Sequence, residues 1–329
     1  MAQAGGVVSI KRNGVGRLMD WVDIGRAREA YRAGQNVMAV LKREANITAN
    51  TSEIIEIAYD LQAGSYIDLL ESDLPRFLDI GREVRTHLQA HITEDCVLLD
   101  VGSGELTMLS LVFREAGLTV SELLACDLSW SRIYKGRDYW NSTVPNRQPR
   151  LTPFVADMAH IPLASKSVDF VMTTHALEPN GSALPVLLRE LFRVCRQKLI
   201  LFEPSYELNT AEGRARMDRL GYIKRLEETA AALGGAVIDV QPLSAIASPL
   251  NPTVCYVIEP PADGLSAAAT CHGRFCVPGT DFPLMEDAGF LRSPDCGLVF
   301  PVLKSIPVLK PHVAILATAL EDDTGAMPG

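Results

Sequence analysis

The sequence predicts an α/β protein built on a mostly parallel sheet. Three observations carry this prediction. Apolar runs of strand length alternate with amphipathic helical segments, the first three runs each contain or precede an aspartate, and the first of these turns holds two glycines. The 329-residue chain has 47% hydrophobic and 22% charged residues, which is ordinary for a globular protein with a sizeable core. A chain of this length holds about two domains of usual size.

The first turn is the strongest local signal. Residues 97–101 (VLLDV) form a strand-length apolar run, and Asp100 is followed by Gly102 and Gly104 before a helical pattern begins. Glycines let the backbone turn tightly and approach a ligand closely. A dinucleotide site would place Gly or Ala where Thr107 stands and would disfavour a carboxylate beside the pyrophosphate. A carboxylate beside exposed turn amides suits a ligand with an ammonium and a carboxylate, such as the methionine end of S-adenosylmethionine.

Acidic residues also follow the next two predicted strands. The run 123–127 ends in Asp127, which at such a position can accept hydrogen bonds from both ribose hydroxyls, and Ser129 is a candidate helix N-cap. The run 151–155 is followed closely by Asp157. Open α/β sheets bind ligands at the carboxyl ends of their strands, so we expect the three aspartates to lie at one edge.

At these positions the chain resembles the class I S-adenosylmethionine-dependent methyltransferases, whose first motif has the pattern acid-x-Gly-x-Gly. The resemblance implies a Rossmann-like seven-stranded methyltransferase sheet and S-adenosyl-L-methionine as the cofactor. It also implies that Asp157 bonds the adenine amino group, with Met158 or its neighbours against the ring. The expected cofactor-binding residues are Tyr59, Tyr66, Asp100, Gly102, Gly104, Asp127, Leu128, Asp157, Met158 and His175.

Further apolar runs complete the predicted sheet. Residues 167–173 and 198–202 read as the fourth and fifth strands, and 237–240 with 252–259 fits the antiparallel hairpin that closes such a sheet. A Pro-rich turn after Glu259 then reads as a linker. The chain is therefore divided into an N-terminal helical cap (1–90), a catalytic domain that binds S-adenosylmethionine (91–262) and a small β-rich domain with a flexible C-terminal tail (263–329).

The N-terminal segment is predicted to be helical. Residues 50–53 (NTSE) are typical of a helix start, and an amphipathic pattern resumes over 74–88. Tyr59 and Tyr66 are seven residues apart and share a helix face if Gly64 does not interrupt the helix. Two readings stay open: the rings lie on a helix surface, or the helix covers the cofactor cleft and closes a tyrosine over the sulfonium or the substrate.

The segment 274–309 resembles the small zinc-ribbon-like activator subunit of tRNA and protein methyltransferases. That module normally carries two Cys-x-x-Cys pairs, of which Cys276 and Cys296 can represent one member each. The partner positions are not cysteines, and Cys271 and His272 stand at irregular spacing. Structural zinc takes four thiolate or imidazole ligands, so we expect an activator-like domain without metal.

Methyl transfer from a sulfonium needs mainly the in-line positioning of a nucleophile, plus removal of its proton when the nucleophile is a hydroxyl or an ammonium. Catalytic candidates therefore follow the fourth and fifth strands: His175, Glu178, Glu203, Tyr206 and Glu207. His175 is a general base, an orienting group or a structural histidine.

The carboxylates Glu178, Glu203 and Glu207 are expected to converge on one rim. An acidic pocket favours a cationic acceptor through charge-assisted hydrogen bonds. The preferred prediction is N-methylation of a small amino or guanidino compound that resembles an amino acid. The alternative is O-methylation of a small molecule in specialised metabolism.

Charge and composition oppose other classes. The net charge of −9 disfavours nucleic-acid binding, and the loop 175–180 lacks the Asp/Asn-Pro-Pro-aromatic signature of DNA amine methyltransferases, so a tRNA or protein methyltransferase ranks lower. The intact Asp and Gly positions oppose a binding module that has lost the cofactor. No apolar stretch approaches ~20 residues, and no secretory signal is evident. We expect a cytoplasmic biosynthetic enzyme with a small-molecule substrate and no nucleic-acid or membrane partner, with a homodimer as an open alternative.

Overall fold

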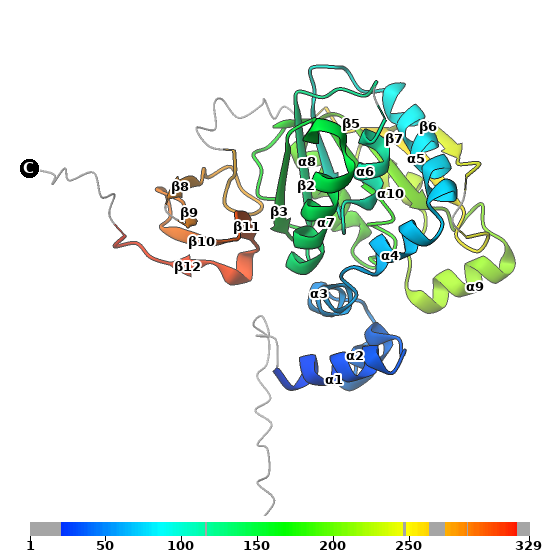
Figure 1. The fold of residues 1–329 in the computed structure, drawn as a ribbon, viewed down its shortest axis with the longest axis horizontal. Helices are drawn as coiled ribbons and strands as arrows, with labels where there is room; N and C mark the ends of the chain where they lie inside the picture. The colour runs from blue at the N-terminus through cyan, green and yellow to red at the C-terminus, as the bar shows by residue number, and fades with distance from the viewer. Residues whose placement is uncertain (1–20, 116, 246–247, 263–273, 288, 321–329) are drawn as a thin grey trace, which may run out of the picture.

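The computed structural model describes residues 21–115, 117–245, 248–262, 274–287 and 289–320. Its centre is one sheet with the strand order β6-β7-β5-β4-β1-β2-β3-β11-β10-β9-β8 (Figure 1). The seven strands from β6 to β3 in that order form the mostly parallel sheet, and the predicted α/β fold with a Rossmann-like seven-stranded sheet is confirmed. They are β1 (Val97–Val101), β2 (Glu122–Asp127), β3 (Leu151–Ala156), β4 (Val168–Thr174), β5 (Cys195–Pro204), β6 (Ala236–Pro242) and β7 (Thr253–Glu259).

Strands β1 to β5 run parallel, and β7 enters antiparallel between β5 and β6. Strand β1 pairs with β2 on one side and β4 on the other, so the chain changes direction across the sheet between them. Ligands of open α/β sheets bind at such a switch point, outside the carboxyl ends of the strands. The topology therefore places the candidate site at the ends of β1 and β4.

Alternating residues of β1 enter two core layers, as the period of two in a strand requires. Leu99 packs with α8 and α10 on one face, whereas Leu98 packs with α5, α6 and α7 on the other. The helices of the catalytic domain are α6 (Thr107–Phe113), α7 (Trp130–Thr143), α8 (Leu184–Val194), α9 (Ala211–Leu220) and α10 (Leu226–Ala232), with a 3-10 turn η1 (Pro145–Arg147). Helix α7 begins after Ser129, whose hydroxyl accepts a hydrogen bond from the amide of Arg132, as the sequence predicted.

The N-terminal part is helical from residue 21, where the described residues begin. It consists of α1 (Trp21–Arg32), α2 (Val37–Ala45), α3 (Ser52–Leu61), α4 (Ser65–Ser72) and α5 (Leu74–Gln89). Thr51 caps α3 within the predicted start signal. Gly64 adopts a φ of 105° and separates α3 from α4, so the single helix face that would unite Tyr59 and Tyr66 does not exist.

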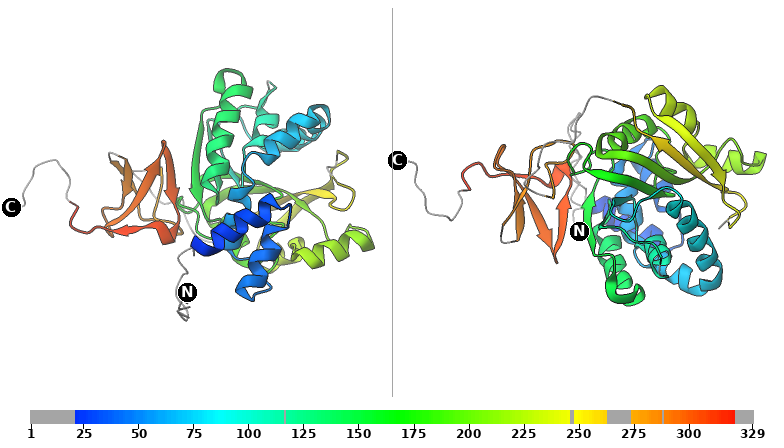
Figure 2. Two further views of the ribbon diagram at one scale, coloured as in Figure 1. Left: turned by 60° about the horizontal axis from the view of Figure 1, so that its bottom comes forward. Right: turned by 90° about the horizontal axis from the view of Figure 1, so that it is seen from above.

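The C-terminal module continues the catalytic sheet. Its elements are β8 (Met285–Asp287), β9 (Phe290–Arg292), β10 (Leu298–Leu303), β11 (Ile306–Leu309), the 3-10 turn η2 (Pro311–Val313) and β12 (Ile315–Leu316). Strand β11 pairs in parallel with β3, with Val308 opposite Val155 and Leu309 opposite Ala156, so the module lies against the β3 edge (Figure 2). Phe275 contacts Phe154 edge to face, with ring centroids 5.1 Å apart. The module and the catalytic domain therefore share one core layer.

Among the described helices, none combines the length and the apolar character needed to cross a membrane. No group of three or more His, Cys, Asp or Glu in the described ranges is arranged to hold a metal ion. Cys271 and His272, which the sequence offered as further zinc ligands, lie outside the described residues.

Because the module shares the core, a cavity at β11 should destabilise the whole molecule. Leu309 is 0% exposed, and Leu309→Ala should lower the free energy of unfolding by about 2–5 kcal/mol in denaturant titrations. Leu303→Ala removes the same atoms from a side chain that is 50% exposed and should change it by less than about 0.5 kcal/mol. Separate melting of the module, with the main transition unchanged, would contradict the shared core.

Candidate active site

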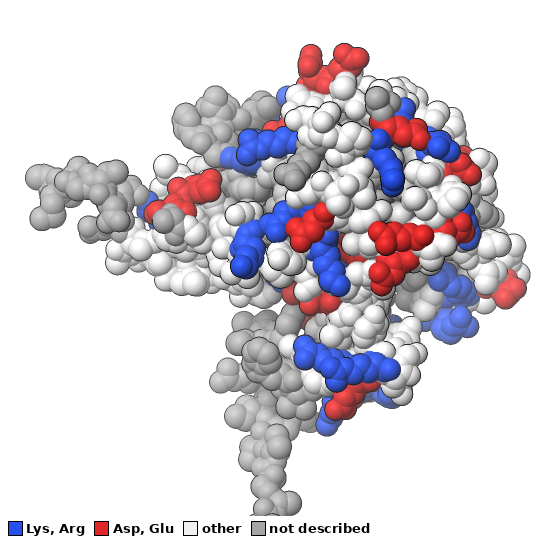
Figure 3. Space-filling model, in the orientation of Figure 1, with Lys and Arg blue, Asp and Glu red and all other residues white. Residues whose placement is uncertain are grey.

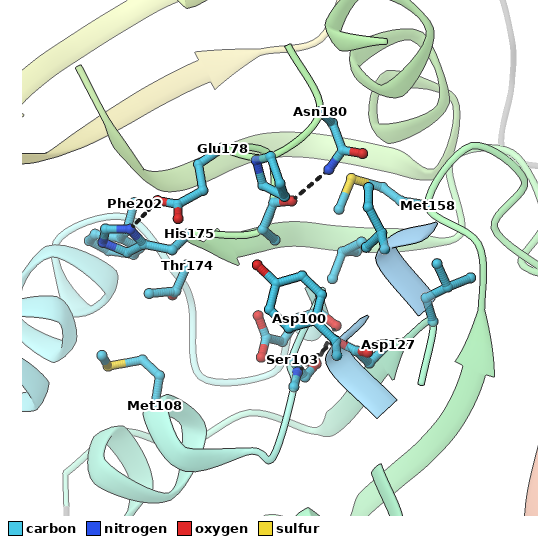
Figure 4. Close-up of a pocket in the computed structure, with 18 of the residues that line it drawn as sticks. Asp100, Ser103, Met108, Asp127, Met158, Thr174, His175, Glu178, Asn180 and Phe202 are labelled. Carbon is cyan, nitrogen blue, oxygen red and sulfur yellow. Dashed lines mark hydrogen bonds and ion pairs between the residues drawn. The ribbon is translucent and has the colours of Figure 1, made fainter. Parts of the chain in front are cut away.

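A cavity of about 720 Å³ opens at the carboxyl ends of β1 to β4, beneath α3, α4 and α5. This volume is typical of small-molecule sites. The ten residues expected to bind cofactor all line it: Tyr59, Tyr66, Asp100, Gly102, Gly104, Asp127, Leu128, Asp157, Met158 and His175. Figure 4 shows Asp100 and Asp127 together in one part of the cavity, with His175 and Glu178 apart from them beside Phe202.

The turn after β1 needs its glycines. Gly102 has a φ of 73°, and a Cβ built on it would overlap the side chain of Ala176 in the loop after β4. The amides of Gly102 and Ser103 both donate to the carbonyl of Cys126, at 2.8 and 2.9 Å, which fixes the turn to β2. Leu106 takes a φ of 54°, a conformation that costs a non-glycine residue free energy. The backbone of the turn is therefore held close to the cavity.

The hydrogen bonding of Asp100 shows whether the turn fits S-adenosylmethionine. Its side chain is buried, and its Oδ1 has no hydrogen-bond partner among the described residues. Burial, aided by the charge of Asp127, raises the pKa of Asp100 to about 7. A buried carboxylate with an unused acceptor is stabilised by a ligand that donates to it, and an ammonium group does so with opposite charge. The turn therefore fits the methionine end of the cofactor.

The other two aspartates are held by backbone amides. Asp127 accepts from the amides of Gly104 and Ser129, each at 2.9 Å, and Asp157 accepts from the amide of Ala159 at 2.9 Å. A carboxylate has about four acceptor sites, so both retain capacity for a ligand. Their assignment to ribose and adenine remains a prediction.

Tyr59 and Tyr66 meet in the cavity although they lie on different helices. The guanidinium carbon of Arg132 is 5.0 Å from the ring centroid of Tyr59 and 4.6 Å from that of Tyr66. Burial raises the pKa of both tyrosines, that of Tyr59 strongly, so both stay neutral. Sequence reasoning missed Arg132, although an arginine three residues after an N-cap and five after Asp127 was a visible signal.

His175, which is partly exposed, pairs with the buried Glu178. His175 Nδ1 lies 2.7 Å from Glu178 Oε2, and Nε2 lies 2.8 Å from the hydroxyl of Thr253. Asn251 donates to Glu178 Oε2 at 3.0 Å. Burial by itself lowers the pKa of His175, but the hydrogen bond and charge of Glu178 raise it above the usual value. The pKa of Glu178 is lowered by His175 against the opposing effect of burial, so the carboxylate is ionised.

Glu203 does not reach the cavity, contrary to the expectation from sequence. It is 0% exposed, and its carboxylate accepts from the hydroxyl of Thr173 at 2.7 Å. It also accepts from the amides of Ala176, Leu177 and Glu178, at 3.0 to 3.2 Å. Burial raises the pKa of Glu203 to about 7. Glu203 therefore fixes the loop that carries His175.

Tyr206 and Glu207 also lie away from the cavity lining. The hydroxyl of Tyr206 lies 3.2 Å from Asp218, and Glu207 accepts from the amide of Arg225 at 2.8 Å. The predicted convergence of three carboxylates is therefore wrong, since Glu178 alone of the three lines the cavity.

Several polar residues of the lining were missed from the sequence. Asn251 and Thr253 reach His175 because β7 lies beside β5, and Asn180 donates to the carbonyl of Ala176 at 3.0 Å. Asn50 donates to the carbonyl of Pro179 at 2.7 Å and joins the cap to the same loop. No local pattern marks Asn251 or Thr253, because only the strand order brings them to the site.

Residues 99–202 match the family model described as a methyltransferase domain. Among curated proteins, none matches the sequence at a significant level. The structure of the [4+2]-cyclase SpnF is similar to this chain, with 16% identity and a TM-score of 0.50, over 66% of this chain and 98% of that one. Magnesium protoporphyrin IX methyltransferase from Synechocystis PCC 6803, with bound SAH, gives 11% identity and a TM-score of 0.48, over 64% and 99%. A SAM-dependent methyltransferase from Methanosarcina mazei gives 13% and 0.45, over 54% and 97%.

The structural likenesses show the fold alone, and one of these neighbours is described as a cyclase, so the fold does not fix the reaction. The domain match adds the activity class. Residues 99–202 are similar to a methyltransferase domain, and this match supports a methyltransferase that uses S-adenosylmethionine as its methyl donor. Neither the family match nor the fold identifies the molecule that accepts the methyl group.

The raised pKa of Asp100 should make cofactor binding depend on pH. Below pH 7 the carboxyl is largely protonated and cannot pair with an ammonium group, so affinity for S-adenosylhomocysteine should rise as pH rises through about 7. One coupled proton allows a change of up to about tenfold per pH unit below that value. Calorimetry from pH 5.5 to 8.5 measures it. Asp100→Asn should bind more weakly and lose the dependence, whereas Asp157→Asn should keep it; a dependence that persists in Asp100→Asn would refute the role.

Proposed function

We propose that the protein methylates a hydroxyl group of a small molecule with a largely apolar body, and that His175 is the general base. The observation that carries the proposal is the contact of 2.7 Å between His175 and Glu178 in a cavity whose lining includes many apolar side chains. Apolar residues of that lining are Ile55, Leu69, Leu70, Phe77, Ile80, Met108, Leu111, Val186, Leu187 and Leu243.

The geometry favours this alternative over N-methylation of an amino or guanidino compound. The preference for a cationic acceptor depended on three converging carboxylates, and Glu178 alone lines the cavity. Its Oε2 already takes hydrogen bonds from His175 and Asn251. An ionised carboxylate engaged with a histidine orients that ring and raises its basicity, as in other base dyads.

The chain's own residues perform three tasks in this mechanism. When bound, S-adenosylmethionine supplies a methyl group on an electrophilic sulfonium. Glu178 holds the proton of His175 on Nδ1, which leaves Nε2 as the acceptor. The acceptor hydroxyl passes its proton to Nε2, directly or through the hydroxyl of Thr253, which lies 2.8 Å away. The cap helices exclude water from the apolar side.

We also infer that the C-terminal module supports the site in the manner of an activator subunit fused to its enzyme. Strand β11 covers the edge of β3, whose end carries Asp157. Lys310, directly after β11, pairs with Glu56 of α3 at 2.6 Å, and these side chains are 6% and 14% exposed. Helix α3 also carries Tyr59, which lines the cavity. These contacts support a module that fixes the cap without touching the acceptor.

A small-molecule acceptor agrees with the charge of the chain. The net charge is −9, and on the face drawn in Figure 3 the basic side chains of the described residues are interspersed with acidic ones. Such a surface does not favour a phosphate backbone or an anionic membrane. A cytoplasmic location, the absence of nucleic-acid and membrane partners, and a symmetric homodimer remain predictions.

The proposed role of His175 predicts the direction in which the rate changes with pH. His175 acts only when neutral, so kcat/KM should rise with pH through a pKa above the usual histidine value of about 6.5. His175→Asn should lower kcat/KM by about 10²–10⁴-fold. Glu178→Gln removes the charge that raises the pKa and should move the acid limb to lower pH. Turnover is measured as S-adenosylhomocysteine released with a panel of phenols, alcohols and amines.

The control is Glu207→Gln, which changes a glutamate outside the cavity and should leave the pH profile unchanged. Methylation of amines alone, retained in full by His175→Asn, would overturn the assignment of a hydroxyl acceptor.

The module's contact with the cap gives a second test. Lys310→Met leaves the buried Glu56 unpaired, which costs about 3–5 kcal/mol for a fully buried pair and less at this partial exposure. Amides of α3 should exchange faster with deuterium, while those of β1 and β4 stay protected. Lys304→Met, at an exposed position of the same module, is the control. Adding Glu56→Gln to Lys310→Met should recover part of the protection; unchanged exchange in Lys310→Met would refute the coupling.

A further inference from the structure

One cationic side chain of the cavity, that of Arg132, has a donor without a hydrogen bond. Arg132 is 8% exposed and lines the cavity, yet its Nε has no hydrogen-bond partner among the described residues. Its ion-pair contact is with Glu105, whose Oε1 lies 3.5 Å from Nε, beyond the usual hydrogen-bond length. A buried donor such as this Nε–H is costly to leave without an acceptor.

The surroundings of Arg132 keep it charged and fixed. Burial opposes its charge, but the carboxylates around it, that of Asp127 first, raise its pKa above the ordinary value. The guanidinium lies between the rings of Tyr59 and Tyr66. Glu105 is itself held, because its Oε2 accepts from the amide of Ile67 at 2.9 Å. The arginine is therefore a preorganised cation, which suits a planar anion such as a carboxylate.

Its position indicates which carboxylate it binds. A Cβ built on Gly104 would collide with the terminal nitrogens of Arg132, so the guanidinium lies against the glycine turn. Asp100, on the same turn, carries the unused acceptor that fits an ammonium group. S-adenosylmethionine has one anionic group, the α-carboxylate, and it is attached to the same carbon as the ammonium.

We propose that Arg132 binds the α-carboxylate of S-adenosylmethionine, and that Arg132 and Asp100 together recognise the two charges of its amino-acid end. The proposal concerns the donor and does not depend on the acceptor or on His175. It also explains the glycine at position 104, because a side chain there would displace the guanidinium.

The test compares two ligands that differ at the amino-acid end. S-adenosylhomocysteine has the carboxylate, whereas 5′-methylthioadenosine keeps the nucleoside and the sulfur and lacks the amino acid. Arg132→Met keeps the length of the side chain beside the tyrosines and removes the charge. It should weaken binding of S-adenosylhomocysteine by about 10- to 100-fold, in line with the loss of a charge-assisted hydrogen bond. Binding of 5′-methylthioadenosine should change by less than about threefold in the same calorimetric experiment, because that ligand makes no carboxylate contact.

Arg132→Lys keeps the charge but not the two-pronged geometry and should fall between the wild type and Arg132→Met. Arg137→Met, on the same helix but away from the cavity lining, is the matched control and should leave both affinities unchanged. Equal losses for the two ligands would show that Arg132 only supports the tyrosines and would overturn the proposal. Unchanged binding of S-adenosylhomocysteine would also overturn it, and would direct the arginine to a carboxylate of the acceptor.

Discussion

The close contact between the turn after β1 and the loop after β4 is the constraint on which the site depends. Gly102 has no side chain, and this absence lets Ala176 lie against the turn. Glu203 also holds the loop, because its carboxylate accepts hydrogen bonds from three backbone amides of the loop. His175, directly after β4 and at a positive φ of 54°, belongs to this loop. This contact brings Asp100 on the turn and His175 on the loop into the lining of the same cavity.

Much of the fold could be predicted from the sequence because its signals are local. Strands buried on both faces read as continuous apolar runs, and an acid at a strand end falls at the cofactor edge by topology alone. The tyrosines of the cap line the cavity, although the condition set for a shared helix face is not met. Gly64 separates α3 from α4, and both rings instead contact the guanidinium of Arg132.

The catalytic half of the site was less predictable because it is made by tertiary contacts. Glu203 ends an apolar run, as Asp127 does. Its carboxylate oxygens, however, accept hydrogen bonds from amides of the loop after β4 and do not face the cavity. Asn251 and Thr253 are more than 70 residues from His175 in the chain and meet it through the pairing of β7 with β5. Hydrogen-bond partners of this kind have no signature in spacing or composition.

The cap helix α3 is fastened at two points, and this arrangement relates the module to the chemistry. Asp60 accepts from the hydroxyls of Ser129 and Ser131 at 2.7 and 3.0 Å, which ties α3 to the start of α7. Glu56, one helical turn earlier, pairs with Lys310 from the C-terminal module. Tyr59 lies between Glu56 and Asp60 in the sequence, contacts Arg132 on α7 and lines the cavity. Through Lys310, the C-terminal module therefore contacts the same helix that carries Tyr59 into the cavity.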